Sequence, residues 1–241
     1  MSSERARDVP LLIPQPRERM FADGAELARG LAERVTTELE AALRARGRAL
    51  LAVSGGSTPK RFFAELSKAD IDWRAVEITL ADERWVPASD ERSNARLVRE
   101  QLLVNAAVAA RFVPLQIDGH TPESGTEALE REFASRLPID VLILGMGSDG
   151  HTASLFPEGD HLQAALDPAG QRSLLPMHAP GAPEPRITFT LPALVAARHL
   201  HLHIEGAAKQ TVLREALARG ELPIAKVLAA CERPVDVWTC A

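Results

Sequence analysis

The sequence is poor in cysteine and has no long apolar run. Its 241 residues include two cysteines, Cys231 and Cys240, which are too few for a disulfide framework and lack metal-ligand spacing. No window approaches the length of a membrane span, and residues 1–9 are polar and charged, unlike the basic and then apolar start of a signal peptide. We therefore expect a reducing, cytoplasmic location and no contact with a membrane.

An excess of positive charge is also missing. The formal net charge is -5 and the pI is about 5.8. No field over the whole molecule would therefore hold a nucleic acid or an anionic membrane. Any anionic ligand must be held by local groups, and the expected ligand is a small molecule.

Internal repeats and an obvious linker are likewise lacking. With 46% apolar residues, the chain has enough material for one sizeable core. We expect a single domain over residues 1–241 with a flexible tail at residues 1–10; the sequence does not indicate an oligomeric state.

Strand and helix patterns alternate along the chain. Asp23 can cap a helix over residues 25–46, where apolar residues recur every four positions. The other expected helices cover residues 59–66, 93–103, 122–136, 191–195 and 207–218. The expected strands cover residues 49–53, 76–81, 112–115, 140–144, 187–190, 199–205 and 235–239. This alternation predicts an α/β fold: a doubly wound, mostly parallel sheet in a Rossmann-like three-layer arrangement. Residues 176–185, with four prolines and a glycine, are expected to form a surface loop over the site.

Chemically interesting loops follow four of the expected strands. In open α/β sheets ligands bind beyond the carboxyl ends of the strands, so these loops should meet at one rim. The first contains Gly55, Gly56, Ser57 and Thr58 before a predicted helix, a pattern that suits an anion cradle but also an ordinary turn. Residues 52–56 also approximate a nucleophile elbow around Ser54, which would require an acid and a histidine further along the chain.

The loop at residues 145–151 displays a histidine among glycines. Three glycines leave Asp149 and His151 as its only ionisable side chains. A histidine titrates near neutral pH and suits proton transfer, and Asp149 could orient it. The alternative is a purely structural role, in which His151 caps a helix beginning near Thr152.

Two cations follow other strands. Arg84 presents a fork of donors suited to phosphate or carboxylate, whereas its neighbour Glu83 reads as a solvated charge. Lys209 lies near the start of a predicted helix, where the dipole disfavours a cation unless an anion lies between them. A solvated lysine is the alternative.

Three histidines, His199, His201 and His203, alternate along one expected strand. At about 3.3 Å per residue the outer two lie roughly 13 Å apart, so a single zinc ion could not engage all three. We interpret them as the polar face of a peripheral strand and expect no metal.

Taken together, these loops resemble the glucosamine-6-phosphate isomerase/6-phosphogluconolactonase family. The resemblance spans nearly the whole chain. It rests on residues 54–59, 82–86, 92–94, 145–157, 186–190 and 206–209.

The resemblance implies hydrolysis of 6-phospho-D-glucono-1,5-lactone to 6-phosphogluconate in the oxidative pentose phosphate pathway, without a cofactor. It makes His151 the general base with Asp149 beside it. The remaining implied substrate-binding residues are Gly55, Gly56, Ser57, Thr58, Asp82, Arg84, Arg186 and Lys209. Which of the three cations holds the phosphate is left open.

Three other functions remain as alternatives. The deaminases of the family have a catalytic glutamate five residues beyond the histidine, where this chain has Phe156, which disfavours their ring-opening chemistry. A sugar-phosphate-sensing module and a serine hydrolase using Ser54 are the other two.

Overall fold

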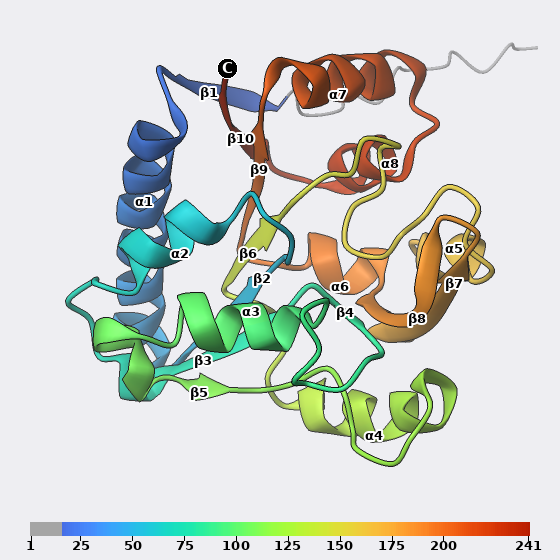
Figure 1. Cartoon of the computed structure of the whole chain (residues 1–241), viewed down its shortest axis with the longest axis horizontal. Helices are drawn as coiled ribbons and strands as arrows, with labels where there is room; N and C mark the ends of the chain where they lie inside the picture. Colours follow the sequence, from blue (N-terminus) through green and yellow to red (C-terminus); the bar gives the residue numbers. More distant parts are fainter. Residues whose placement is uncertain (1–15) are drawn as a thin grey trace, which may run out of the picture.

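Seven parallel strands form the main sheet of the computed structural model, which describes residues 16–241 (Figure 1). The flexible tail expected at residues 1–10 lies outside these residues. The strand order is β1-β10-β9-β6-β2-β3-β5. Their bounds are β1 Arg17–Phe21, β2 Ala49–Val53, β3 Val76–Leu80, β5 Arg111–Phe112, β6 Val141–Leu144, β9 His199–Glu205 and β10 Asp236–Cys240. The expected fold class, a mostly parallel α/β sheet flanked by helices, is confirmed.

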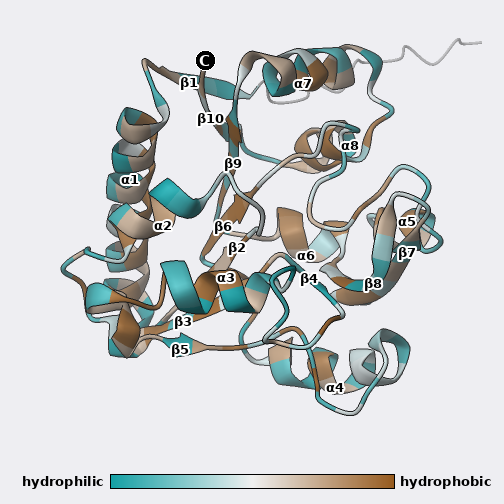
Figure 2. Cartoon of the chain, viewed as in Figure 1, coloured by the Kyte–Doolittle hydropathy of each residue, from teal (hydrophilic) through white to brown (hydrophobic). Residues whose placement is uncertain are grey.

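Helices cover both faces of this sheet. In Figure 1, α1 and α2 lie on one side, and α6, α7 and α8 lie on the other. The helices are α1 Gly24–Arg46, α2 Lys60–Leu66, α3 Asn94–Gln101, α4 Pro122–Ala134, α5 Leu162–Ala165, α6 Leu191–Val195, α7 Ala207–Arg219 and α8 Pro223–Ala230, with short 3-10 turns at Trp73–Ala75 and Asn105–Ala109. Apolar colour concentrates on the central strands and on the helix sides that face them (Figure 2). No helix among residues 16–241 combines the length and the hydrophobicity needed to cross a membrane.

Helix α1 shows how local sequence sets the frame. The Asp23 carboxylate accepts the N–H groups of Ala25 and Glu26, and Gly47 ends the helix with a φ of 69°. The apolar stripe is buried on the sheet, as its four-residue spacing predicts. The helix is the one expected, one residue longer at its start.

The strand order reverses between β2 and β6. From β2 the chain proceeds outward through β3 to β5, and from β6 it proceeds the other way through β9 to β10. A crevice at the carboxyl ends of such a pair is the usual ligand site of a doubly wound sheet. The loops at residues 54–59 and 145–151 leave the sheet at this point.

The prediction of a surface loop over residues 176–185 is wrong. β7 (Leu174–Ala179) and β8 (Ala182–Phe189) form an antiparallel hairpin, and β4 (Asp82–Arg84) pairs with the far end of β8. The proline of β7 is tolerated because β7 is an edge strand. The prolines of β8 are tolerated because β4 pairs only with residues 186–188, which lie beyond them. The register also shifts between Met177 and Ala179.

The interpretation of β9 as a peripheral strand with a polar face is also wrong. β9 lies between β10 and β6, and both His201 and His203 are 2% exposed. Trp238 Nε1–H donates to Nδ1 of His201 at 3.1 Å, so Nε2–H donates to the Glu38 carboxylate of α1 at 2.7 Å. His201 therefore faces α1, and the ring of His203 packs edge-on against Phe62 of α2, with ring centroids 6.3 Å apart.

Smaller differences concern edges and pairing. The strand expected at residues 112–115 is reduced to Arg111–Phe112. The elements β1, β4, β7, α5 and α8 were not expected. β1 and β4 are short strands whose partners are distant in the sequence, so the local pattern gives little indication of them.

Candidate active site

A cavity of about 220 Å³ opens at the switch point between β2 and β6. All four loops expected at one rim line it, together with residues from β8 and α3. Of the ten site residues expected from the sequence, every one except Asp149 lines the cavity, and Asp149 contacts His151. The expected residues in the wall are Gly55, Gly56, Ser57, Thr58, Asp82, Arg84, His151, Arg186 and Lys209.

His151 is held by a carboxylate and by a neighbouring ring. Its Nδ1 lies 2.6 Å from Oδ1 of Asp149, which also accepts the backbone N–H of His151 at 3.2 Å. The ring centroid of Phe156 is 4.4 Å away. No helix begins near Thr152; residues 152–155 form a turn with an isolated bridge, so the reading of His151 as a helix cap is wrong.

A glycine makes room for this histidine. A Cβ at Gly147 would lie 2.2 Å from Cε1 of His151 and 2.6 Å from Oδ1 of Asp149. The backbone of the loop thus passes directly beneath the imidazole, and only glycine allows that approach.

Two arginines and an aspartate stand on the β4 and β8 side of the cavity. Arg186 Nη1 lies 3.9 Å from Oδ2 of Asp82, which also accepts the Ser154 hydroxyl at 2.5 Å. Arg84 Nη1 donates to the backbone oxygen of Arg92 at 2.5 Å. Burial lowers the pKa of Arg186, with the nearby Asp82 carboxylate opposing that shift.

Glu83 is not the solvated charge expected from the sequence. Its carboxylate is buried and accepts the backbone N–H groups of Asn94 and Ala95 at the start of α3, at 2.8 and 2.7 Å. Burial raises its pKa, while those N–H groups oppose the shift. Glu83 therefore anchors α3 behind the cavity and does not line it.

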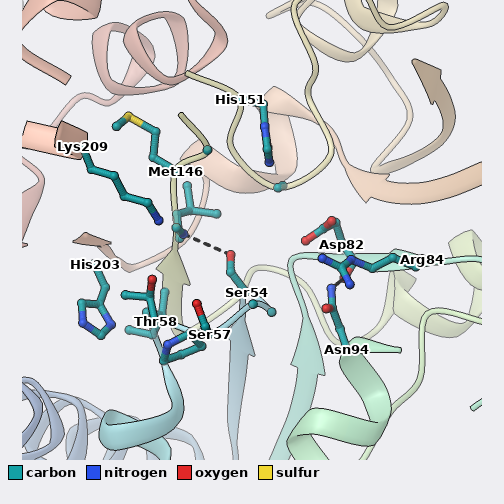
Figure 3. A pocket seen from close by; sticks show the side chains of 18 of the residues that line it. Ser54, Ser57, Thr58, Asp82, Arg84, Asn94, Met146, His151, His203 and Lys209 are labelled. Carbon is teal, nitrogen blue, oxygen red and sulfur yellow. Dashed lines mark hydrogen bonds between the residues drawn. The ribbon is translucent and has the colours of Figure 1, made fainter. Parts of the chain in front are cut away.

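Lys209, Ser57 and Thr58 lie on the opposite side of the cavity from Arg84 and Asp82 (Figure 3). Lys209 lies in the first turn of α7, as expected. His203 stands beside them; burial, and then the charge of Lys209, lower its pKa to about 4. This side therefore carries a cation, two hydroxyls and a neutral imidazole.

The nucleophile-elbow reading of Ser54 finds no histidine partner. Ser54 Oγ accepts the N–H of Gly145 at 3.2 Å, and neither His151 nor His203 hydrogen-bonds it within residues 16–241. The contact instead ties the loop after β2 to the loop after β6 (Figure 3).

Two polar residues in the cavity wall, Asn94 and His203, had no expected role in the site. Asn94 belongs to residues 92–94, which carry part of the family resemblance but had no assigned role. Its place at the cavity depends on the packing of α3 against β4. His203 was interpreted as part of a polar face, although its position near the end of the strand, two residues before Glu205, could have indicated its place at the cavity. Among residues 16–241, no three His, Cys, Asp or Glu side chains are grouped to hold a metal ion.

Sequence comparison decides the family. A family model described as glucosamine-6-phosphate isomerases/6-phosphogluconolactonase matches residues 22–238. The chain belongs to this family.

Individual members resemble the chain along nearly all of its length. A 6-phosphogluconolactonase from Rhizobium meliloti is 48% identical over 91% of this chain and 96% of its own, and one from Mesorhizobium japonicum is 50% identical over 90% and 92%. The crystal structure of a 6-phosphogluconolactonase from Shewanella baltica superposes with a TM-score of 0.90 at 41% identity, covering 95% of this chain and 99% of that one. The expected enzyme class of this family member, a hydrolase of a sugar-phosphate lactone, is confirmed.

Proposed function

We propose that this enzyme hydrolyses 6-phospho-D-glucono-1,5-lactone to 6-phosphogluconate in the cytoplasm, as the second step of the oxidative pentose phosphate pathway. The observation that carries the proposal is the pairing of His151 with Asp149 on one side of a cavity whose other side offers Lys209, Ser57 and Thr58. The names of the relatives agree with it.

The two sides of the cavity suit the two ends of this substrate. A phosphate needs donors and positive charge, which Lys209 and the two hydroxyls supply together with the N–H groups at the start of α7. The lactone carbon then lies toward His151. Lys209 is thus assigned to the phosphate, and Arg84 and Arg186 face the remainder of the substrate from β4 and β8.

The contact with Asp149 fixes the form of His151 that can act as a base. An ionised carboxylate can only accept, so Nδ1 of His151 carries the hydrogen and Nε2 keeps a free lone pair. Nε2 removes a proton from a water molecule, and the hydroxide attacks the lactone carbonyl carbon. Asp149 also stabilises the imidazolium that forms.

Negative charge then builds on the carbonyl oxygen. A donor preorganised for that oxygen contributes about 2.7 to 4 kcal/mol, and Arg84 and the N–H groups of the glycine loops are the available donors. As the carbonyl re-forms, the bond to the ring oxygen breaks, and that oxygen takes the proton from His151. Water and lactone are consumed, the free carboxylic acid is formed, and no metal or cofactor takes part.

The test is turnover of freshly generated lactone by the wild type and by His151→Ala, with spontaneous opening subtracted. We expect the variant to remain folded and to lose about 10² to 10⁴ in kcat. His120→Ala, which changes an exposed histidine outside the cavity, should keep wild-type turnover.

Two results would oppose the proposal. Near wild-type turnover by folded His151→Ala would remove His151 as the base. Release of ammonia from glucosamine 6-phosphate without lactone hydrolysis would assign the chain to the deaminases instead. We do not expect it, because Phe156 stands where the deaminases have a catalytic glutamate.

A further inference from the structure

Asn94 presents a bare oxygen to the cavity. Its side chain is held at one end, because Nδ2 donates to the backbone oxygen of Asp82 at 2.9 Å. This contact fixes which end of the amide faces which way. No described residue donates to Oδ1, although Asn94 is only 2% exposed and lines the cavity.

The backbone opposite this oxygen is shaped around it. A Cβ at Gly55 would lie 1.8 Å from Oδ1 of Asn94. The absence of a side chain at Gly55 therefore lets the loop after β2 pass close to the amide. A side chain at position 55 would displace the Asn94 amide.

Ser54 offers the complementary group. Its Oγ accepts the N–H of Gly145, so the lone pair on that side is used while the hydroxyl hydrogen has no acceptor among the described residues. Figure 3 shows Ser54 between the Lys209 side and the Asp82 side of the cavity, with Asn94 facing it from α3. A free donor thus stands at the middle of the cavity, and an acceptor faces it from the Asp82 side.

A sugar hydroxyl matches this pair, whereas the ends of the substrate do not. Oδ1 of Asn94 is an acceptor only, so it repels a phosphate oxygen or a carbonyl oxygen. A hydroxyl can donate to Oδ1 and accept from Ser54 at once. Between a phosphate on C6 and a reacting carbon at C1, the groups that remain are the hydroxyls on C2, C3 and C4.

We propose that Asn94 and Ser54 are specificity-determining residues that together bind one ring hydroxyl of the phosphorylated lactone. The inference rests on the proposed function and extends it to the middle of the substrate. It gives the enzyme a means to reject lactones that lack this hydroxyl, because a buried acceptor would then lose its only donor.

The experiment measures a discrimination ratio, the kcat/KM for the full lactone divided by that for its 2-deoxy, 3-deoxy or 4-deoxy analogue. For one of the three analogues the wild-type ratio should reach about 5- to 150-fold. In Asn94→Ala and in Ser54→Ala that ratio should fall at least about fivefold. General damage lowers the efficiency on both lactones and cancels in the ratio.

Ser57→Ala serves as the matched control, because it removes a hydroxyl from the phosphate side of the same loop. It should lower efficiency on the full and deoxy lactones together and leave the ratio unchanged. Should Asn94→Ala fail to fold, Ser54→Ala still decides the outcome.

Ratios near one for all three analogues in the wild type, or unchanged ratios in both variants, would overturn the inference while leaving lactone hydrolysis intact. A wild type that hydrolyses none of the lactones would instead overturn the proposed function, and this inference with it.

Discussion

The residues in and beside the cavity differ in the role proposed for each. His151 and Lys209 are the proposed base and phosphate-binding cation, whereas Asn94 offers a neutral oxygen and Asp149, outside the cavity wall, orients the His151 ring. The sequence indicated His151 and Asp149 because they stand in a glycine-rich loop after a strand, and Lys209 because it lies near the start of a helix. Asn94 could not be predicted, since its partners at Gly55 and Asp82 come from other loops.

Lys209 provides the clearest test at this scale. Lys209→Ala should lower kcat/KM for the phosphorylated lactone by about 10- to 150-fold, because a hydrogen bond to a charged group contributes about 1.5 to 3 kcal/mol. Hydrolysis of unphosphorylated gluconolactone should hardly change. Steady-state kinetics on both lactones measures the difference.

The control for Lys209 is Lys226→Ala, which removes an exposed lysine from α8 and should affect neither lactone. Equal losses on both lactones in Lys209→Ala would assign Lys209 to the reacting end or to the fold. The phosphate would then belong to Arg84 or Arg186.

Whole elements were predicted where one local pattern decides them. The stripe of α1, the apolar runs of β2 and β6 and the alternating pattern of β9 are visible in the sequence, and the structure has these elements at nearly the expected bounds. β7 and the first half of β8 were missed, because proline argues against a strand unless its neighbours are known, whereas the end of β8 was expected at residues 187–190. The burial of β9 was missed because alternation does not tell whether a polar row faces water or α1.

The loop at residues 145–151 is the element on which catalysis depends most. Gly147→Ala would place a methyl group 2.2 Å from Cε1 of His151, so the imidazole must move. A displacement of about 1 Å can cost roughly 10²-fold in rate, and we expect kcat to fall by about that factor while the protein stays folded.

Gly181→Ala is the matched control for this change. Gly181 lies in the turn between β7 and β8, and an added Cβ there meets nothing within 4 Å. Its turnover should match the wild type. Unimpaired turnover in Gly147→Ala would mean that the ring position is not critical.

The molecule as a whole carries a net charge of -5 yet must attract a substrate that carries a phosphate. The proposed site meets this need with local cations, because Lys209 lines one end of the cavity and Arg84 and Arg186 line the side of β4 and β8. The need for local cations could be foreseen from composition, because a chain of negative charge can hold an anion only through local groups. The placement of each cation in the cavity could not be foreseen, since it depends on the order of the strands in the sheet.

Metal dependence is a property of the whole enzyme that can be measured directly. We expect a chelator to leave lactone hydrolysis unchanged, because His151 alone can generate the nucleophile. Activity is compared before and after chelation and dialysis, with metal content determined in parallel. Activity lost with stoichiometric zinc and restored by adding zinc back would contradict the mechanism.

The stability of the folded molecule should depend on pH through His203. Burial, and then the charge of Lys209, lower its pKa from 6.5 to about 4. Between about pH 6.5 and 4, His203 is therefore protonated in the unfolded chain but neutral in the folded protein. Stability from this group is fully present above pH 6.5 and is lost as the pH falls toward 4.

Between pH 7.5 and 5 these two pKa values correspond to a loss of about 2 kcal/mol in the free energy of unfolding. His203→Leu keeps an apolar side chain of similar size but cannot titrate, so its free energy of unfolding should fall by about 2 kcal/mol less over the same range. Urea unfolding of both proteins at the two pH values measures this. Any constant cost of the substitution, including its lost contact with Glu205, cancels when each protein is compared with itself. Identical pH dependence in the two proteins would mean that His203 is protonated in the folded state despite its burial.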